Sequence, residues 1–162
     1  MTGAGQRIID MYSEKAIELL LPELETGLFD DNWRIRLSSV QLLGDLLYRI
    51  SGVSGKMSTE SANEDDNLGT ENCQMVVLAV LGRERRDRVL AGLYMGRSDT
   101  ALLVRQAALH VWKVIVAHTP KMLREIMSTL FQLLLGCLAS QSYDKRQVIT
   151  QRVCTCYEYY KY

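Results

Sequence analysis

Apolar side chains recur at alternating steps of three and four residues between Asp31 and Ile50, which is the spacing of one face of an α-helix. The first row of these side chains comprises Trp33, Leu37, Val40, Leu43, Leu47 and Ile50. A second row, on another face, comprises Ile35, Leu42 and Leu46. Asp31 and Asn32 precede both rows, and their side chains can cap a helix by accepting hydrogen bonds from unpaired backbone N–H groups. Two apolar rows predict a helix that packs on two sides, inside a stack.

The same periodicity predicts further helices over residues 12–29, 73–81, 83–95, 100–118 and 120–139. Short connections between successive helices favour antiparallel neighbours. The stretch 51–72 differs, because it is rich in Ser, Gly, Thr and Asn and lacks an apolar period. It holds five acidic residues against one lysine, so we expect an acidic, flexible loop there.

The predicted helices repeat. Arg36 and the apolar residues that follow it match Arg105 and the apolar residues that follow that arginine, at a shift of 69 residues. Arg146 lies 41 residues after Arg105. A period near 40 with two helices per unit is typical of HEAT repeats. We therefore predict an all-α HEAT-repeat α-solenoid of about three helical pairs, the last one incomplete. The expected division is a lead-in and first pair over 1–50, the acidic loop over 51–72, a second pair over 73–118, and a third, incomplete pair with a divergent tail over 119–162.

Composition narrows the class of protein. Nineteen basic and nineteen acidic residues cancel over 162 positions, so no overall charge attracts nucleic acid or an anionic membrane. The four cysteines are too few and too irregular for a disulfide framework, which favours a reducing compartment. The start of the chain does not resemble a signal peptide, and no apolar run is long enough to span a membrane.

The candidate chemistry is that of a binding surface. Arg83, Arg85, Arg86 and Arg88 form a basic run that could contact ribosomal RNA phosphates or an acidic partner, or could be a solvated helix start with internal ion pairs. The recurring arginines at 36, 105 and 146 could face a ligand, but pairing with neighbouring acids along the stack is the favoured interpretation.

No catalytic, cofactor or metal site is expected. The pair Cys154 and Cys156 lacks the further ligands of a zinc site, and His110 and His118 have no catalytic partner in the sequence. We predict a protein that is not an enzyme, that uses no cofactor, and that has no small-molecule substrate.

Four segments also resemble a known family, the very large HEAT-repeat translational activators of general amino-acid control. They are AIELLLPELETGLFDDNWRIRLSSVQLLGDLL, GKMSTESANEDDNLGT, RRDRVLAGLYMGRSDTALLVRQAALHVWK and TLFQLLLGCLAS. The resemblance covers roughly residues 5–146, includes irregular stretches, and stops near Arg146, so we expect a fragment with a truncated or mispredicted tail. It implies a cytoplasmic scaffold that binds ribosomes and helps to activate the kinase that phosphorylates the initiation factor two alpha subunit in amino-acid starvation.

Two other functions stay open. One is a generic HEAT adaptor, such as a transport receptor or a phosphatase scaffold. The other is a HEAT-like enzyme acting on nucleic acid, which would need a concave basic face with an aromatic side chain and a carboxylate. Of these features, only the basic run over 83–88 is present in the sequence.

Overall fold

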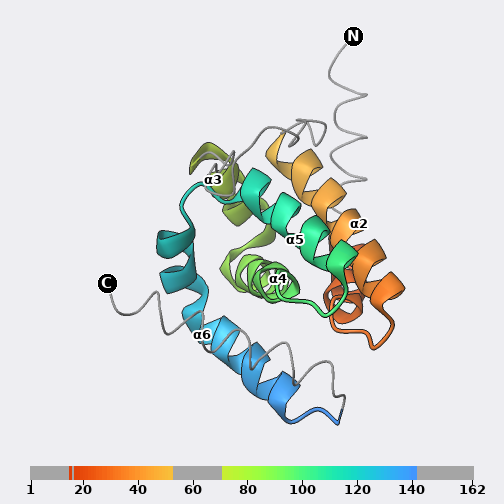
Figure 1. The fold of residues 1–162 in the computed structure, drawn as a ribbon. Helices are drawn as coiled ribbons and strands as arrows, with labels where there is room; N and C mark the ends of the chain where they lie inside the picture. The colour runs from red at the N-terminus through yellow and green to blue at the C-terminus, as the bar shows by residue number, and fades with distance from the viewer. Residues whose placement is uncertain (1–14, 16, 53–70, 142–162) are drawn as a thin grey trace.

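The computed structural model describes residues 15, 17–52 and 71–141 (Figure 1). Every regular element in these ranges is an α-helix, as predicted. The elements are a helical segment over 17–27, α2 (Trp33–Ser51), α3 (Glu71–Leu81), α4 (Arg83–Gly96), α5 (Leu102–Ile115) and α6 (Thr119–Leu138). Most of the expected acidic loop and all of the expected divergent tail, including Arg146, Cys154 and Cys156, lie outside the described residues.

The ends of the helices follow from local chemistry. The Asn32 side chain caps α2 by accepting a hydrogen bond of 3.0 Å from the backbone N–H of Arg34. Gly52, with φ of 70°, ends this helix in the left-handed conformation that glycine adopts without strain. Gly82 separates α3 from α4 with φ of 77° and ψ of 164°, an extended conformation at positive φ that glycine adopts without strain. The sequence identified Asn32 and the interruption at Gly82 correctly.

The helices form two layers. In one layer α2 and α5 lie side by side, and in the other α4 packs against both α6 and the segment 17–27 (Figure 1). Within a helical pair the two layers approach closely at a glycine. A Cβ added to Gly27 would collide with the Ser39 side chain, and a Cβ on Gly96 would lie 3.1 Å from the Ala108 Cβ. These two crossings are 69 residues apart, so the repeat in the sequence is also a repeat in the packing.

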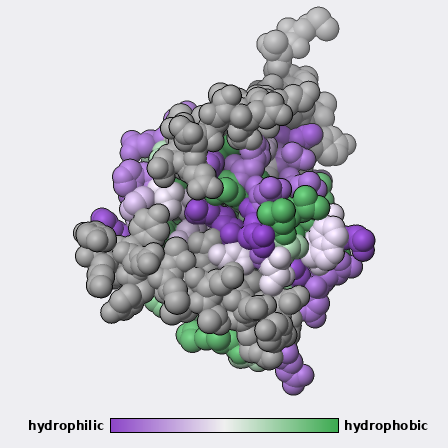
Figure 2. Space-filling view, in the orientation of Figure 1, coloured by the Kyte–Doolittle hydropathy of each residue, from purple (hydrophilic) through white to green (hydrophobic). Residues whose placement is uncertain are grey.

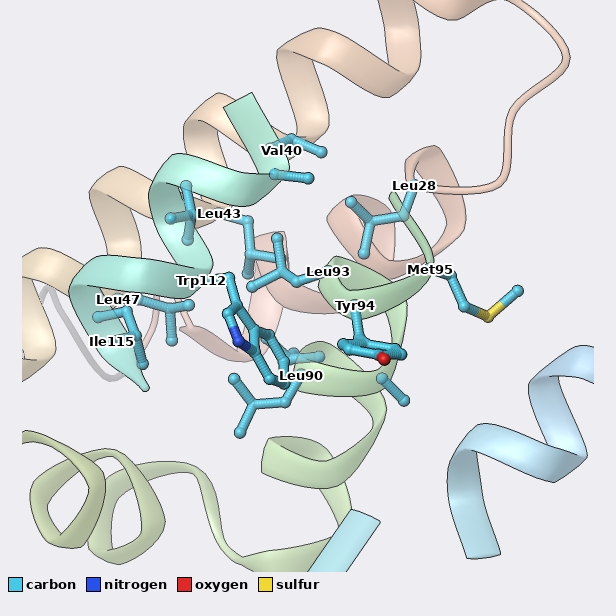
Figure 3. Close-up of a cluster of buried hydrophobic side chains, with 14 of the residues drawn as sticks. Leu28, Val40, Leu43, Leu47, Leu90, Leu93, Tyr94, Met95, Trp112 and Ile115 are labelled. Carbon is cyan, nitrogen blue, oxygen red and sulfur yellow. The ribbon is translucent and has the colours of Figure 1, made fainter. Parts of the chain in front are cut away.

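The core lies between the two layers. Figure 3 shows Leu43 and Leu47 of α2 facing Leu93 and Tyr94 of α4, with Trp112 of α5 among them. All five side chains are buried, and the rings of Tyr94 and Trp112 have centroids 5.2 Å apart. The three helices therefore share one continuous core.

The prediction that α2 packs on two sides is confirmed, but the second side is not the second apolar row. The first apolar row is inward, but Ile35 and Leu42 of the second row are 45% and 56% exposed. The helix packs on α5 through another face, where a Cβ on Gly44 would lie 2.7 Å from Val111. Small and polar residues such as Gly44 and Arg36 occupy this face, so a search for apolar rows overlooked it.

No helix in the described ranges is both long and apolar enough to cross a membrane.

Candidate interaction surface

The basic run begins α4, and the structure divides it. Arg83 is exposed over 77% of its side chain, and its guanidinium lies 3.9 Å from the Asp87 carboxylate. Arg85 is also exposed and makes no ion pair with a described residue. Because Gly82 offers no capping side chain, the first turn of α4 presents its backbone N–H groups together with these two cations. This turn is the part of the run that faces solvent.

Arg86 faces the interior instead. Its side chain is 5% exposed, and its guanidinium lies 2.6 Å from Asp87 Oδ1 and 3.0 Å from Glu125 Oε2 of α6. Arg88, at 41% exposure, donates to Glu25 Oε2 at 3.2 Å and to Glu84 Oε1 at 2.8 Å. Two arginines that are two residues apart thus hold α4 to the helices on either side of it. This matches the internal ion pairs that the sequence left open for the run.

The recurring arginines bind the corners between helices. Arg36 Nη1 donates to the backbone carbonyls of Asp30 and Asp31, and its Nε and Nη2 bind the Asp99 carboxylate at 2.7 and 2.9 Å. Both charged residues are buried, with 7% exposure for Arg36 and 6% for Asp99. Arg105 repeats the first half of this pattern, since its Nη1 donates to the carbonyls of Asp99 and Thr100. The favoured interpretation, pairing along the stack, is confirmed for Arg36.

Sequence reasoning missed the acidic partner of this pair. Asp99 lies six residues before Arg105, and Asp30 lies six residues before Arg36. Asp30 Oδ1 accepts from the Asn32 N–H at 2.7 Å, and Asp99 Oδ1 accepts from the Ala101 N–H at 2.8 Å. The repeated spacing of six residues between an aspartate and an arginine is the signal in the sequence that points to Asp99 as the partner.

The two histidines make structural contacts. His118 Nδ1 accepts a hydrogen bond of 3.2 Å from the backbone N–H of Lys121 and so caps α6. His110 meets the edge of the Tyr48 ring, with centroids 6.4 Å apart. Among the described residues, no group of three or more His, Cys, Asp or Glu side chains is placed to hold a metal ion.

Tyr48 carries a buried hydroxyl without a hydrogen-bond partner among the described residues. Burial, with a smaller effect of the Asp45 charge, raises the pKa of Tyr48 from 10.0 to about 12. Between these two values the folded state keeps a proton that the unfolded state has lost, so this group lowers stability as the pH rises through that interval. Below it the hydroxyl is neutral in both states and titration contributes nothing.

Replacing Tyr48 with phenylalanine is therefore expected to leave stability unchanged or slightly raised near neutral pH, because it removes an unsatisfied polar group. Above pH 10 the variant should lose less stability than the parent. Urea unfolding of both proteins at about pH 8 and about pH 11 measures this difference in stability. The other tyrosines and the lysines are the same in both proteins, so their titration cancels in the comparison. If the difference in free energy of unfolding between the two proteins is the same at both pH values, the raised pKa of Tyr48 is contradicted.

The fold and the repeating corners define the class of protein. Residues 20–50 match the HEAT repeat family, and the two layers of helices are those of an all-α solenoid of HEAT-type pairs. Over 145 residues, 90% of its length, the chain is 68% identical to the stalled ribosome sensor GCN1 of Homo sapiens. It is 45% identical over 148 residues, 91% of its length, to the eIF-2-alpha kinase activator GCN1 of Saccharomyces cerevisiae. It is 51% identical over 146 residues, 90% of its length, to Protein ILITYHIA of Arabidopsis thaliana.

The resemblance stated from the sequence is confirmed by these identities. The chain spans about 5% of the length of each of these three curated relatives. No solved structure matches the chain.

Proposed function

We propose that this chain is a scaffold segment of a cytoplasmic protein that senses stalled ribosomes and activates the eIF-2-alpha kinase. The observation that carries the proposal is the identity of 68% over 90% of the chain with the human stalled ribosome sensor. The relative from Saccharomyces cerevisiae, named as an eIF-2-alpha kinase activator, supports the second half of the proposal. The segment would act by presenting surface shape and charge, without a covalent step.

An exchange of segments tests this function. In the Saccharomyces cerevisiae relative, the matching segment is replaced by this chain, and phosphorylation of eIF-2-alpha is measured in starved cells together with cosedimentation with ribosomes. The expected result is that both activities persist. A matched control carries HEAT pairs of the same length from an unrelated adaptor, and it should lose at least one activity. Equal activity of the two chimaeras would favour the alternative of a generic HEAT adaptor.

Arg83 and Arg85 are proposed as the ribosome-facing part of the basic run, with ribosomal RNA phosphates as their partners. They are the exposed cations of that run. Arg86 is buried and forms ion pairs, and Arg88 is partly exposed and forms ion pairs with Glu25 and Glu84. Phosphate contacts release counterions, so their contribution to binding falls as salt rises.

Reversing both charges, with Arg83→Glu and Arg85→Glu in the chimaera, is expected to weaken cosedimentation with ribosomes at low salt. The slope of the logarithm of the binding constant against the logarithm of the salt concentration should become shallower by about one unit for each phosphate contact that is lost. The control variant reverses Arg49 and Arg124, which are exposed on α2 and α6. Binding that is unchanged by the first pair, and insensitive to salt, would remove these arginines from the interface.

A further inference from the structure

The two acidic residues within the basic run differ in where their carboxylates lie. Asp87 is held inward, because its Oδ1 accepts from Arg86 Nε and Nη2 at 2.8 and 2.6 Å and its side chain is 10% exposed. The Glu84 side chain is 86% exposed, and Glu84 lies in the sequence between Arg83 and Arg85. Glu84 is therefore the acid that shares the exposed first turn of α4 with the two exposed cations.

The first turn of α4 attracts anions. Its backbone N–H groups receive no hydrogen bond from a capping side chain, since Gly82 precedes them. A carboxylate near the start of a helix is stabilised by such N–H groups and by the positive end of the helix dipole. The Glu84 carboxylate and a phosphate of a bound nucleic acid thus favour the same place. A carboxylate in that place repels the phosphate and uses the donors that the phosphate needs.

Arg88 binds the Glu84 carboxylate one helical turn away from that place. Its Nη1 donates to Glu84 Oε1 at 2.8 Å, across the i,i+4 spacing. Its Nε donates at 3.2 Å to Glu25 Oε2, which comes from the segment 17–27 and whose side chain is 21% exposed. An exposed ion pair within one helix is weak by itself, but here a second helix fixes the guanidinium. The neighbouring helix therefore helps to determine where the exposed acid of α4 lies.

We propose that Arg88 is a positioning residue for the ribosome contact. It binds Glu84 and so leaves the two exposed arginines and the first N–H groups of α4 open to a phosphate, while Arg88 itself contacts no phosphate. The proposal rests on the proposed contact of Arg83 and Arg85 with ribosomal RNA. It replaces the direct contact that the sequence suggested for Arg88, and it makes Glu84 an internal competitor of the phosphate.

A double-mutant cycle on ribosome binding tests this role. Arg88→Gln, Glu84→Gln and the double variant are made in the Saccharomyces cerevisiae relative that carries this chain, and cosedimentation with ribosomes is measured at several salt concentrations. At low salt, Arg88→Gln should weaken binding about fivefold, the effect in water of one unit charge about 4 Å from a phosphate. In the Glu84→Gln background the same substitution should weaken binding by less than about twofold, because no carboxylate is released.

Two further measurements separate positioning from contact. Because Arg88→Gln removes no phosphate contact, it should leave the slope of the logarithm of the binding constant against the logarithm of the salt concentration unchanged. Arg83→Gln should make that slope shallower by about one unit. Arg49→Gln is the matched control, since Arg49 is exposed in the last turn of α2 and its loss removes the same charge without releasing Glu84.

Glu84→Asp tests the role without altering Arg88 or its contact with Glu25. The shorter side chain keeps the charge in the first turn but does not reach Arg88, so binding should again weaken about fivefold. Unchanged binding for Glu84→Asp would overturn the proposal. An equal loss for Arg88→Gln with and without Glu84 would also overturn it, in favour of a direct phosphate contact or of loosened packing against the segment 17–27.

The charge reversal of Arg83 and Arg85 distinguishes the two proposals. If that reversal weakens binding but the cycle shows no coupling between Arg88 and Glu84, the ribosome contact stands and the positioning role is wrong. If neither the reversal nor the cycle changes binding, both proposals are wrong.

Discussion

Replacing Trp112 with alanine is expected to lower the free energy of unfolding by about 3–5 kcal/mol, the cost of removing a large aromatic side chain from a packed core. Trp112 is 1% exposed and lies among Tyr94, Leu90 and Ile115 (Figure 3). Its Nε1–H also donates to the Thr119 hydroxyl at 3.0 Å, at the first turn of α6. One substitution therefore opens a cavity in the core and breaks a contact between α5 and α6.

Urea unfolding of the purified chain measures this loss. Trp33→Ala serves as the control, because Trp33 is only partly buried at the edge of the same core. It should cost less than half as much as Trp112→Ala. Equal costs for the two tryptophans would contradict the deeper burial of Trp112 in the shared core.

Replacing Asp99 with asparagine is expected to cost about 3 kcal/mol, because it removes the charge that the buried Arg36 guanidinium binds. The substitution keeps the shape of the side chain and an oxygen that can accept from the Ala101 N–H. The substitution therefore measures the effect of the Asp99 charge separately from that of the hydrogen bond with the Ala101 N–H. The effect comes from the burial of both partners, at 7% and 6% exposure.

Asp45→Asn is the matched control for Asp99→Asn, since Asp45 is an exposed aspartate on α2 and should change stability by less than about 0.5 kcal/mol. Arg36→Met combined with Asp99→Leu should recover part of the loss, because an apolar pair leaves no unpaired charge. A loss below about 1 kcal/mol for Asp99→Asn alone would mean that water reaches the pair and screens it.

The class of fold was predictable because the apolar spacing in this chain is regular. The row from Val40 to Leu47, the interruption at Gly82 and the repeat of Arg36 at Arg105 are all visible in the sequence and all correspond to observed features. The boundaries were less predictable. The helix expected to run to His118 ends at Ile115, because His118 is used as the cap of the next helix. A histidine cap is rare enough that the pattern gave no reason to expect it.

The surface was less predictable than the fold. In the sequence, a run of arginines predicts one basic patch. Adjacent positions on a helix point in different directions, however, and Arg85 therefore faces solvent whereas Arg86 is buried. The partners that bury Arg86 and Arg88 come from Glu125 and Glu25, which are distant in sequence. Pairing of this kind depends on how helices pack, and a single sequence without a structure does not contain it.

Exposed apolar side chains are not confined to α2. Leu102 and Leu103, in the first turn of α5, are 56% and 52% exposed. Figure 2 shows separate apolar areas among hydrophilic ones on one side of the molecule. Scattered exposed leucines are ordinary on protein surfaces. Ile35 and Leu42 differ from these leucines, because their equivalents 69 residues later, Val104 and Val111, are buried.

The contact between Arg36 and Asp99 also bears on how the chain folds and how freely its length can vary. It joins residues 63 positions apart, whereas the helices and the corner carbonyl bonds of each arginine form between near neighbours. Contacts close in sequence form first and distant ones later, so each helical pair is expected to assemble before the two pairs dock. Closing a longer loop is cheap, since doubling its length costs only about 0.6 kcal/mol. Insertions between two pairs are therefore tolerable, and a long stack of this kind can gain or lose connecting residues without losing its register.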